Sequence, residues 1–169
     1  MFRIKICGIT RPEDARAAAE AGADAIGLNF YEKSSRYLPL LQQQELLAAN
    51  RTIRVGVFVN ADRLALEEIA GRNQLDAIQL HGDEPPDFLA NLPSQYKVIR
   101  AWRMDERGVA AIAEDLDACR AAGRVPDAVL VDAFTPGRYG GTGETVTWAG
   151  LTDYRNWLGD IPLILAGGL

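Results

Sequence analysis

Cys7 and Asp132 are the two side chains in this sequence whose chemistry best suits proton transfer. Cys7 ends an apolar stretch in the run Lys5-Ile6-Cys7-Gly8-Ile9-Thr10, and Asp132 ends another in Val129-Leu130-Val131-Asp132. A thiolate takes up a proton and a carboxylic acid gives one, so the pair supplies both partners of acid–base catalysis. If each residue ends a strand, both lie at the sheet edge where α/β proteins bind ligands.

Both residues also have plainer interpretations, which the sequence leaves open. A free cysteine is most often a small buried hydrophobe, and Asp132 can instead cap a helix or lie in a solvated loop. Lys5 precedes Cys7 by two residues, so the two share one face of a strand, and the Lys5 ammonium would favour the thiolate. Ile4 and Ile6 face the helices instead.

Two further polar side chains follow predicted strands. Arg36, in Lys33-Ser34-Ser35-Arg36, can hold a carboxylate through two parallel hydrogen bonds, or can lie in a solvated surface loop. His81, in Leu80-His81-Gly82-Asp83-Glu84, comes at a strand end and is a candidate pocket residue. Capping a helix or ordering the loop is an equal alternative for His81, which shares its strand face with Gln79.

Glycine-rich stretches follow the last two predicted strands. The amides of Gly140-Gly141-Thr142-Gly143 can line a ligand, and Gly141 is the candidate there. Gly167 and Gly168, in Leu165-Ala166-Gly167-Gly168-Leu169, are candidates to bind phosphate, because loops after strands 7 and 8 of a barrel often do so. The alternative for both stretches is a simple turn.

Apolar runs rich in β-branched residues alternate with helical patterns along the chain. The predicted strands are Arg3–Cys7, Asp24–Phe30, Ile53–Val59, Asp76–Leu80, Lys97–Ala101, Asp127–Asp132 and Pro162–Ala166. The predicted helices are Pro12–Ala21, Leu40–Ala49, Ala61–Gly71, Pro86–Leu92, Glu106–Ala122 and Thr147–Leu158. Parallel strands need crossovers, so this order predicts a parallel sheet with helices outside it.

Residues at the helix ends give local support. Thr10 and Glu13 match a capping box, with Pro12 in the first turn. Gly22 and Gly123 stand where helices end.

Two architectures fit this order of elements, an open doubly wound sheet and a closed (β/α)8 barrel. The first βα turn holds a single glycine, Gly8, so the GxGxxG fingerprint is absent. Seven strands favour the barrel, which typically takes about 200 residues or more. The 169 residues stop just after the seventh strand. We therefore predict an α/β fold, a (β/α)8 TIM barrel truncated after strand 7, with residues 1–169 as one incomplete domain.

Composition narrows the class of protein. With 48% hydrophobic residues the chain can bury a core, and its net charge of −5 disfavours nonspecific nucleic-acid binding. We see no secretory signal and no apolar run of about 18 residues, and so expect a cytoplasmic protein with no membrane partner. Two cysteines without CxxC spacing and one histidine argue against a disulfide scaffold or a zinc site. Cys119 lies in a predicted helix, and we expect its side chain to contribute to helix packing.

Six stretches together resemble the phosphoribosylanthranilate isomerases, (β/α)8 enzymes of tryptophan biosynthesis. They are KICGIT (5–10), GADAIGLNFYEKSSRY (22–37), VGVFVN (55–60), QLHGDE (79–84), GGTGETVTW (140–148) and LAGGL (165–169). The resemblance implies an Amadori rearrangement of N-(5'-phosphoribosyl)anthranilate to 1-(2-carboxyphenylamino)-1-deoxyribulose 5-phosphate, without metal or cofactor. The expected partner is a phosphorylated small molecule, and the chain is expected to be a monomer or a homodimer.

The resemblance also implies roles for individual residues. Asp132 would be the general acid that opens the furanose ring, and Cys7 the general base that removes the C2′ proton. Arg36 would bind the anthranilate carboxylate. Gly167 and Gly168 would contact the phosphate.

Three features depart from the family pattern. Asn29 stands in a strand that is more often wholly apolar, and Glu144 stands where the family usually carries lysine. The third is the lack of a seventh helix and an eighth strand, which would leave strands 1 and 7 with unpaired edges, so we expect a longer biological protein.

Two alternatives remain open on the sequence. One is another phosphosugar barrel, such as the related histidine-pathway isomerase or indole-glycerol-phosphate synthase. The former is expected to use paired aspartates, so a cysteine on the first strand speaks against it. The other is an inactive truncated module that binds phosphate ligands.

Overall fold

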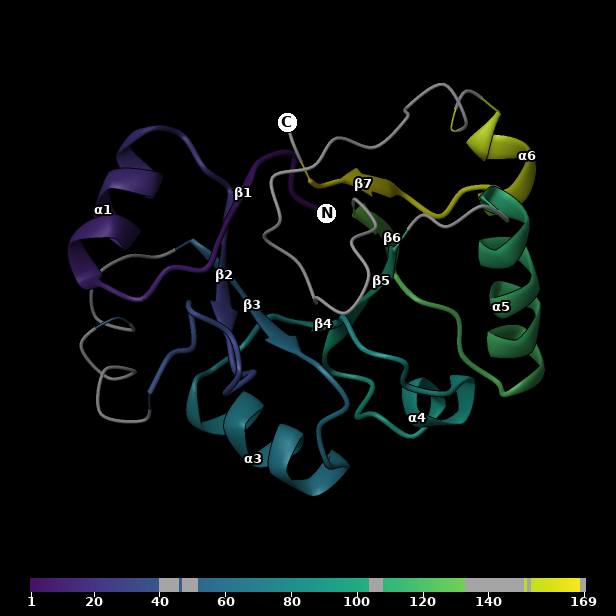
Figure 1. Ribbon diagram of the computed structural model, residues 1–169, viewed down its shortest axis with the longest axis horizontal. Coiled ribbons are helices and arrows are strands. Elements are labelled where there is room, and N and C mark those ends of the chain that lie inside the picture. Colours follow the sequence, from purple (N-terminus) through teal and green to yellow (C-terminus); the bar gives the residue numbers. More distant parts are fainter. Residues whose placement is uncertain (40–45, 47–51, 104–107, 133–150, 152, 168–169) are drawn as a thin grey trace. The chain divides into compact units, whose positions relative to one another are not determined.

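The computed structural model describes residues 1–39, 46, 52–103, 108–132, 151 and 153–167 (Figure 1). The described residues form two compact units. The first is Met1–Gln79 with Pro93–Lys97, and the second is Leu80–Leu92 with Val98–Leu169. Among the helices described in either unit, none is both long and apolar enough to cross a membrane.

Parallel strands in chain order make up the first unit. They are β1 (Lys5–Cys7), β2 (Ala25–Asn29), β3 (Ile53–Phe58) and most of β4 (Ala77–Leu80), in the order β1-β2-β3-β4. In this register Cys7 lies opposite Gly27. The helix α1 (Pro12–Glu20) contacts β2, and α3 (Arg63–Arg72) connects β3 to β4 (Figure 1). These helices are crossovers of the kind that parallel strands require.

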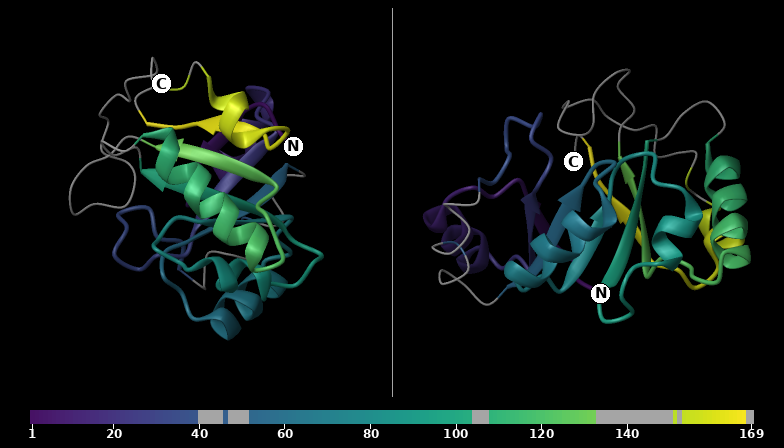
Figure 2. Two further views of the ribbon diagram at one scale, coloured as in Figure 1. Left: turned by 90° about the vertical axis from the view of Figure 1, so that its right-hand side faces the viewer. Right: turned by 90° about the horizontal axis from the view of Figure 1, so that it is seen from below.

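The second unit repeats this pattern. Its strands β5 (Lys97–Arg103), β6 (Ala128–Asp132) and β7 (Leu163–Leu165) are parallel and follow one another in chain order. The helix α5 (Val109–Ala121) contacts both α4 (Pro86–Ala90) and α6 (Tyr154–Leu158), and Figure 2 shows it running along the outside of the strands. A hydrophobic core joins these helices to the strands through Ile112, Leu116, Val129, Val131, Leu151 and Leu158.

Strand order decides between the two predicted architectures. In a doubly wound sheet the order reverses at a switch point, whereas a barrel keeps the chain order throughout. Neither β1-β2-β3-β4 in the first unit nor β5-β6-β7 in the second contains a reversal. The described strands therefore have barrel connectivity. Every predicted strand is found, each within two residues of its predicted bounds.

Three predicted helices fall partly outside the described residues. Of Glu106–Ala122 the described helix is α5, which begins at Val109. Of Leu40–Ala49 only Leu46 is described, and it is helical. Of Thr147–Leu158 the described helix is α6, which begins at Tyr154.

The helix ends test two local predictions. Helix α1 begins at Pro12, so its N-cap is Arg11, whose side chain makes no capping hydrogen bond. The capping box predicted at Thr10 is therefore wrong, because a proline at the first helical position places the cap one residue later. Gly22 and Gly123 follow the C-caps of α1 and α5 with φ of +90° and +96°, the left-handed conformation that ends helices. That prediction is confirmed.

An aspartate recurs at the amino ends of β2, β4 and β6 and ties each strand to the one before it. Its carboxylate accepts a backbone N–H of the earlier strand, from Ile4 to Asp24 (2.9 Å), Arg54 to Asp76 (2.8 Å) and Val98 to Asp127 (2.9 Å). Hydrogen bonds from the N–H groups of Ile4 and Arg3 hold the pKa of Asp24 below its ordinary value. These bonds lie at the strand ends opposite to those of Cys7 and Asp132, where residues of a barrel serve stability.

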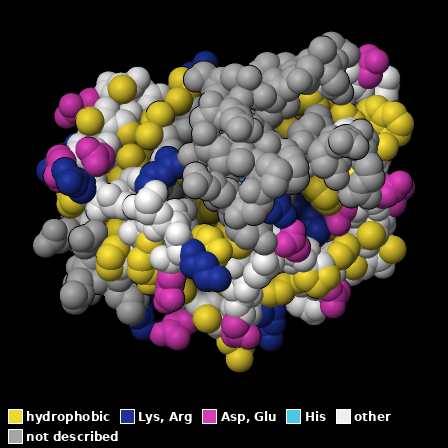
Figure 3. Space-filling model, in the orientation of Figure 1, with side chains coloured by type: hydrophobic (Ala, Val, Ile, Leu, Met, Phe, Trp, Pro, Cys, Tyr) yellow, Lys and Arg dark blue, Asp and Glu magenta, His cyan; other side chains and the backbone are white. Residues whose placement is uncertain are grey.

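The outer face of β1 carries two exposed hydrophobic side chains. Ile4 and Ile6 point away from the face that bears Lys5 and Cys7, and they are 51% and 43% exposed. Figure 3 shows hydrophobic side chains at the surface near α1 and β1. The helices among the described residues therefore leave this pair uncovered.

Candidate active site

The carboxyl end of β1 places a cation beside a thiol. Nζ of Lys5 lies 3.7 Å from Sγ of Cys7 and 2.5 Å from Oε1 of Gln79, a residue of β4. Cys7 is exposed, whereas only 1% of the Gln79 surface is exposed. The interpretation of Cys7 as a buried hydrophobe is therefore wrong. Lys5 and Cys7 share a strand face as the alternation predicts.

The second thiol has opposite surroundings. Cys119 on α5 is fully buried, which confirms its predicted role in packing. Burial and the neighbouring Asp115 carboxylate raise the pKa of the Cys119 thiol to about 11, against an opposing effect of Arg100. Sγ of Cys119 donates a hydrogen bond to Asp115 at 3.4 Å, and Asp115 forms an ion pair with Arg100. At neutral pH this thiol is protonated and therefore a poor nucleophile.

Two glycines leave space around Cys7 and Arg36. Gly27 lies opposite Cys7 on β2, and a Cβ atom at Gly27 would lie 2.7 Å from Sγ. Gly8 has a φ of +82°, and a Cβ atom on it would collide with Cδ of Arg36. A larger residue at either position would displace the thiol or the guanidinium. No local sequence pattern singles out Gly27, because its role depends on the strand register.

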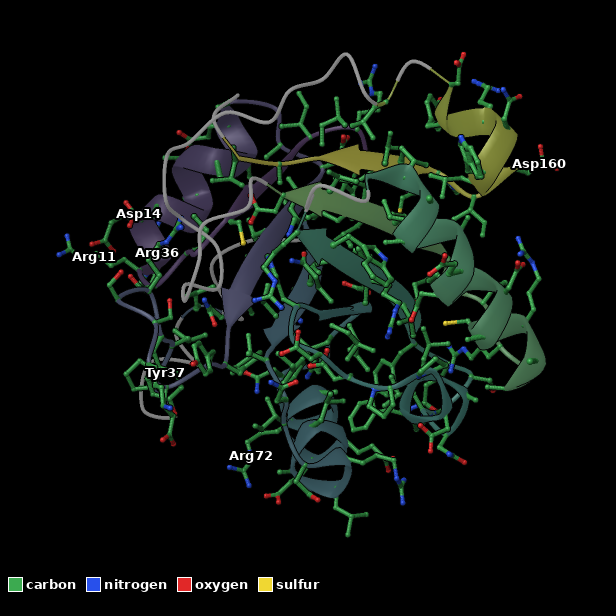
Figure 4. The ribbon with its side chains drawn as sticks, turned by 45° about the vertical axis from the view of Figure 1, so that its right-hand side comes forward. Arg11, Asp14, Arg36, Tyr37, Arg72 and Asp160 are labelled. Carbon is green, nitrogen blue, oxygen red and sulfur yellow. The ribbon has the colours of Figure 1, made fainter. Side chains whose placement is uncertain are left out.

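Arg36 reaches back from the loop after β2 to the carboxyl end of β1 (Figure 4). Its Nη1 donates a hydrogen bond to the carbonyl oxygen of Cys7 at 3.2 Å. Two side chains order the loop that carries it: Nδ2 of Asn29 donates to Oγ of Ser34 at 3.0 Å, and the Arg36 backbone N–H donates to the same oxygen at 3.1 Å. Asn29, the polar residue in an otherwise apolar strand, thus links β2 to the Arg36 loop.

In the second unit, Asp132 and His81 lie next to each other at the carboxyl ends of β6 and β4. Nε2 of His81 is 3.4 Å from Oδ2 of Asp132, so the two form an ion pair when the imidazole is protonated. Both residues are nearly buried, Asp132 with 7% and His81 with 8% of its surface exposed. The interpretation of Asp132 as a solvated loop carboxylate is therefore wrong.

Of the three glycines predicted to line a ligand, only Gly167 is described. It follows β7 with a φ of +85°, a conformation that favours glycine. The preceding residue is anchored to the neighbouring strand, because the N–H of Ala166 donates to the carbonyl of Val131 at 2.9 Å. Gly141 and Gly168 lie outside the described residues.

A pocket of about 480 Å³ lies in the second unit, lined by residues of the loop after β4, of β5 and of α5. Four of its charged side chains form ion pairs, Arg100 with Asp115 at 2.6 Å and Arg103 with Asp83 at 2.5 Å. The carboxylate of Glu84, which also lines the pocket, accepts a hydrogen bond from the backbone N–H of Gly82. Neither His81 nor Asp132 lines it.

The described groups suit acid–base chemistry. The first unit offers a thiol beside an ammonium, and the second offers a carboxyl group beside an imidazole. Within the described parts of the chain, no group of three His, Cys, Asp or Glu side chains is placed to hold a metal ion.

The chain is similar to one family of known proteins over nearly its whole length. The model of the family described as N-(5'phosphoribosyl)anthranilate (PRA) isomerase matches residues 4–169. The N-(5'-phosphoribosyl)anthranilate isomerase of Pseudomonas savastanoi pv. phaseolicola is 47% identical over 169 residues, which cover 99% of this chain and 76% of that protein.

Two solved structures extend the similarity to the fold. The phosphoribosyl anthranilate isomerase of Thermotoga maritima is 35% identical with a TM-score of 0.83, covering 100% of this chain and 78% of that one. A phosphoribosyl anthranilate isomerase in complex with reduced 1-(o-carboxyphenylamino)-1-deoxyribulose 5-phosphate is 32% identical with a TM-score of 0.79, covering 100% and 77%. The chain spans about three quarters of the length of these relatives.

Proposed function

The chain belongs to the N-(5'-phosphoribosyl)anthranilate isomerase family, and we propose that Cys7 is the general base and Asp132 the general acid of its reaction. The chain is thereby an isomerase of tryptophan biosynthesis with the (β/α)8 TIM-barrel fold of the family. Its reaction is the Amadori rearrangement of N-(5'-phosphoribosyl)anthranilate to the 1-deoxyribulose 5-phosphate aminoketose. The observation that carries the proposal is the match over residues 4–169, with Cys7 ending β1 and Asp132 ending β6.

The first step opens the sugar. Asp132 donates a proton to the furanose ring oxygen as the bond from that oxygen to C1′ breaks. The anthranilate nitrogen supplies the electron pair that forms the C1′=N bond of a protonated Schiff base. The position of Asp132 at the carboxyl end of a barrel strand supports this role, because catalytic residues of barrel enzymes come from these ends.

The second step moves a proton from carbon. The Cys7 thiolate removes the C2′ proton, the C–H electron pair forms the C1′=C2′ bond, and the C=N pair returns to nitrogen. The resulting enolamine becomes the ketone when its hydroxyl loses a proton and C1′ gains one. The Lys5 ammonium, 3.7 Å from Sγ, supports this role because a nearby cation stabilises a thiolate.

The remaining candidate residues are assigned to binding. Arg36 holds the anthranilate carboxylate, and His81 lines the site beside Asp132. Backbone amides of Gly167 and Gly168 contact the phosphate, and Gly141 lines the ligand. The exposed Arg36 guanidinium and the left-handed Gly167 support these assignments.

The setting of the enzyme follows from the same assignment. We place it in the cytoplasm, as a monomer or a homodimer that acts without a cofactor and binds neither nucleic acid nor membrane. Its small-molecule partner is the phosphorylated substrate.

A substrate comparison tests the proposed function. The chain is incubated with phosphoribosylanthranilate, whose fluorescence is lost on turnover, and separately with the substrates of the histidine-pathway isomerase and of indole-glycerol-phosphate synthase. We expect turnover of phosphoribosylanthranilate alone, by the wild type and by a Cys119→Ser control. Turnover of either other substrate instead, or binding without turnover, would contradict it.

A further inference from the structure

We propose that Gln79 is a positioning residue that holds the Lys5 ammonium beside the Cys7 thiol while leaving its charge available. The proposal rests on the proposed role of Cys7 as the base. Three side chains from two strands carry it: Lys5 and Cys7 from β1, and Gln79 from β4.

The distances place the ammonium between two partners. Nζ of Lys5 is 2.5 Å from Oε1 of Gln79 and 3.7 Å from Sγ of Cys7. Lysine has a long flexible stem, so a half-buried Lys5 needs a fixed acceptor to keep its charge at one point. Gln79 is such an acceptor, because only 1% of its surface is exposed and its strand is packed on both faces.

The chemical type of the acceptor matters as much as its position. An amide oxygen accepts a hydrogen bond from an ammonium but carries no net charge. A carboxylate at the same place would pair with Lys5 and offset its positive charge at the thiol. Glutamine therefore holds the cation and leaves its field to act on Cys7.

The experiment measures thiol reactivity without substrate. All variants are made in a Cys119→Ser background, so that Cys7 is the one thiol, and its rate of reaction with iodoacetamide is measured at pH 7. Lys5→Met should slow the reaction roughly fivefold or more, the effect of one charge about 4 Å away even in a water-like dielectric. Gln79→Glu should slow the reaction with iodoacetamide at least as much as Lys5→Met does, and Gln79→Leu should slow it less.

A double variant tests whether Gln79 acts through Lys5. In the Lys5→Met background, Gln79→Glu should cause no further loss of reactivity, because a carboxyl group buried at this position without the Lys5 cation stays protonated and brings no negative charge to the thiol. On substrate, Gln79→Glu should lower kcat by a similar factor while KM stays within about twofold, since a thiolate serves the chemical step. Circular dichroism and the urea midpoint check that each variant is folded.

The outcomes separate this proposal from the assignment of Cys7 as the base. Wild-type reactivity in Gln79→Glu, or an equal loss with and without Lys5, would overturn the role of Gln79. A Cys7→Ser variant with wild-type turnover would overturn the base, whatever the alkylation rates. If Gln79→Leu does not fold, the comparison of Gln79→Glu with Lys5→Met still decides.

Discussion

The two cysteines of the chain carry the same functional group in opposite surroundings. Cys7 is exposed at the end of β1 with an ammonium beside it, whereas Cys119 is buried next to a carboxylate that raises the pKa of its thiol to about 11. A general base must be reachable and able to lose its proton near neutral pH. At the residue scale, Cys7 is the reachable thiol, whereas burial and the raised pKa of Cys119 exclude that thiol from this role.

Arg36 gives the first prediction. Arg36→Met should raise KM for phosphoribosylanthranilate roughly 10- to 100-fold, because hydrogen bonds to a charged group contribute about 1.5–3 kcal/mol. It should change kcat only a few-fold, since the carboxylate is bound in both the ground state and the transition state. Steady-state kinetics measure both constants.

Arg11 provides a matched control for the Arg36→Met variant. Arg11 is a second exposed arginine on the same side of the first unit, at the N-cap of α1 (Figure 4). Arg11→Met should leave KM unchanged. Equal KM values for Arg36→Met and the wild type would remove the carboxylate assignment.

At the scale of elements, the two ends of the strands carry residues of different kinds. Their carboxyl ends bear Cys7 and Asp132, and the amino ends of the even-numbered strands bear the recurring aspartate. The aspartate stands in the same local sequence each time, Asp-Ala followed by Ile or Val, at Asp24, Asp76 and Asp127. The aspartates thus stabilise the amino ends of these strands, and the residues proposed to be catalytic lie at the carboxyl ends.

Asp24 gives a prediction about acid stability. Its pKa is lower in the folded chain than in the unfolded one, because backbone N–H groups of Ile4 and Arg3 bond to the carboxylate. A lowered pKa adds stability above the unfolded value, about 3.9, and that stability is lost as pH falls through the folded value. Asp24→Ala should therefore unfold at lower urea than the wild type at pH 7, with the gap closing below about pH 4.

The urea midpoints of Asp24→Ala and the wild type, measured at several pH values, check this prediction. Asp14, an exposed aspartate in the first turn of α1, is the control, and Asp14→Ala should leave the acid dependence unchanged. A gap for Asp24→Ala that is constant across pH would show that its carboxylate charge is not responsible.

The strands were predictable from the sequence because apolar runs rich in β-branched residues are typical of strands. That Lys5 and Cys7 lie on one face of β1 follows from the alternation of side chains along a strand. Contacts between distant residues were not predictable. The bond of Lys5 to Gln79 joins positions 74 apart, and the space left by Gly27 depends on the register of β1 against β2. The hydrogen bond from Asn29 to Ser34, which links β2 to the Arg36 loop, could be recognised only in the folded structure.

At the scale of the whole molecule, hydrophobic surface is the notable feature. Ile4 and Ile6 are exposed side by side on β1, a strand whose one partner among the described residues is β2. Unpaired strands with apolar side chains associate with other chains. We therefore expect self-association through this face.

Replacing the pair tests this. Ile4→Thr with Ile6→Thr should move the onset of self-association to a concentration on the order of tenfold higher, because the apolar area available for burial falls while strand propensity is kept. Sedimentation and light scattering measure it. Leu64→Gln is the control, since Leu64 is exposed alone on α3. Identical association of the double variant and the wild type would contradict the expectation.

The turnover number of phosphoribosylanthranilate isomerisation in Cys7→Ser and Asp132→Asn tests the central claim most directly. General acid and base groups contribute about 10²- to 10⁴-fold each, so kcat should fall by that factor in either variant, with KM changed only a few-fold. The Cys119→Ser control should keep wild-type kcat. Wild-type kcat in both Cys7→Ser and Asp132→Asn would contradict the account.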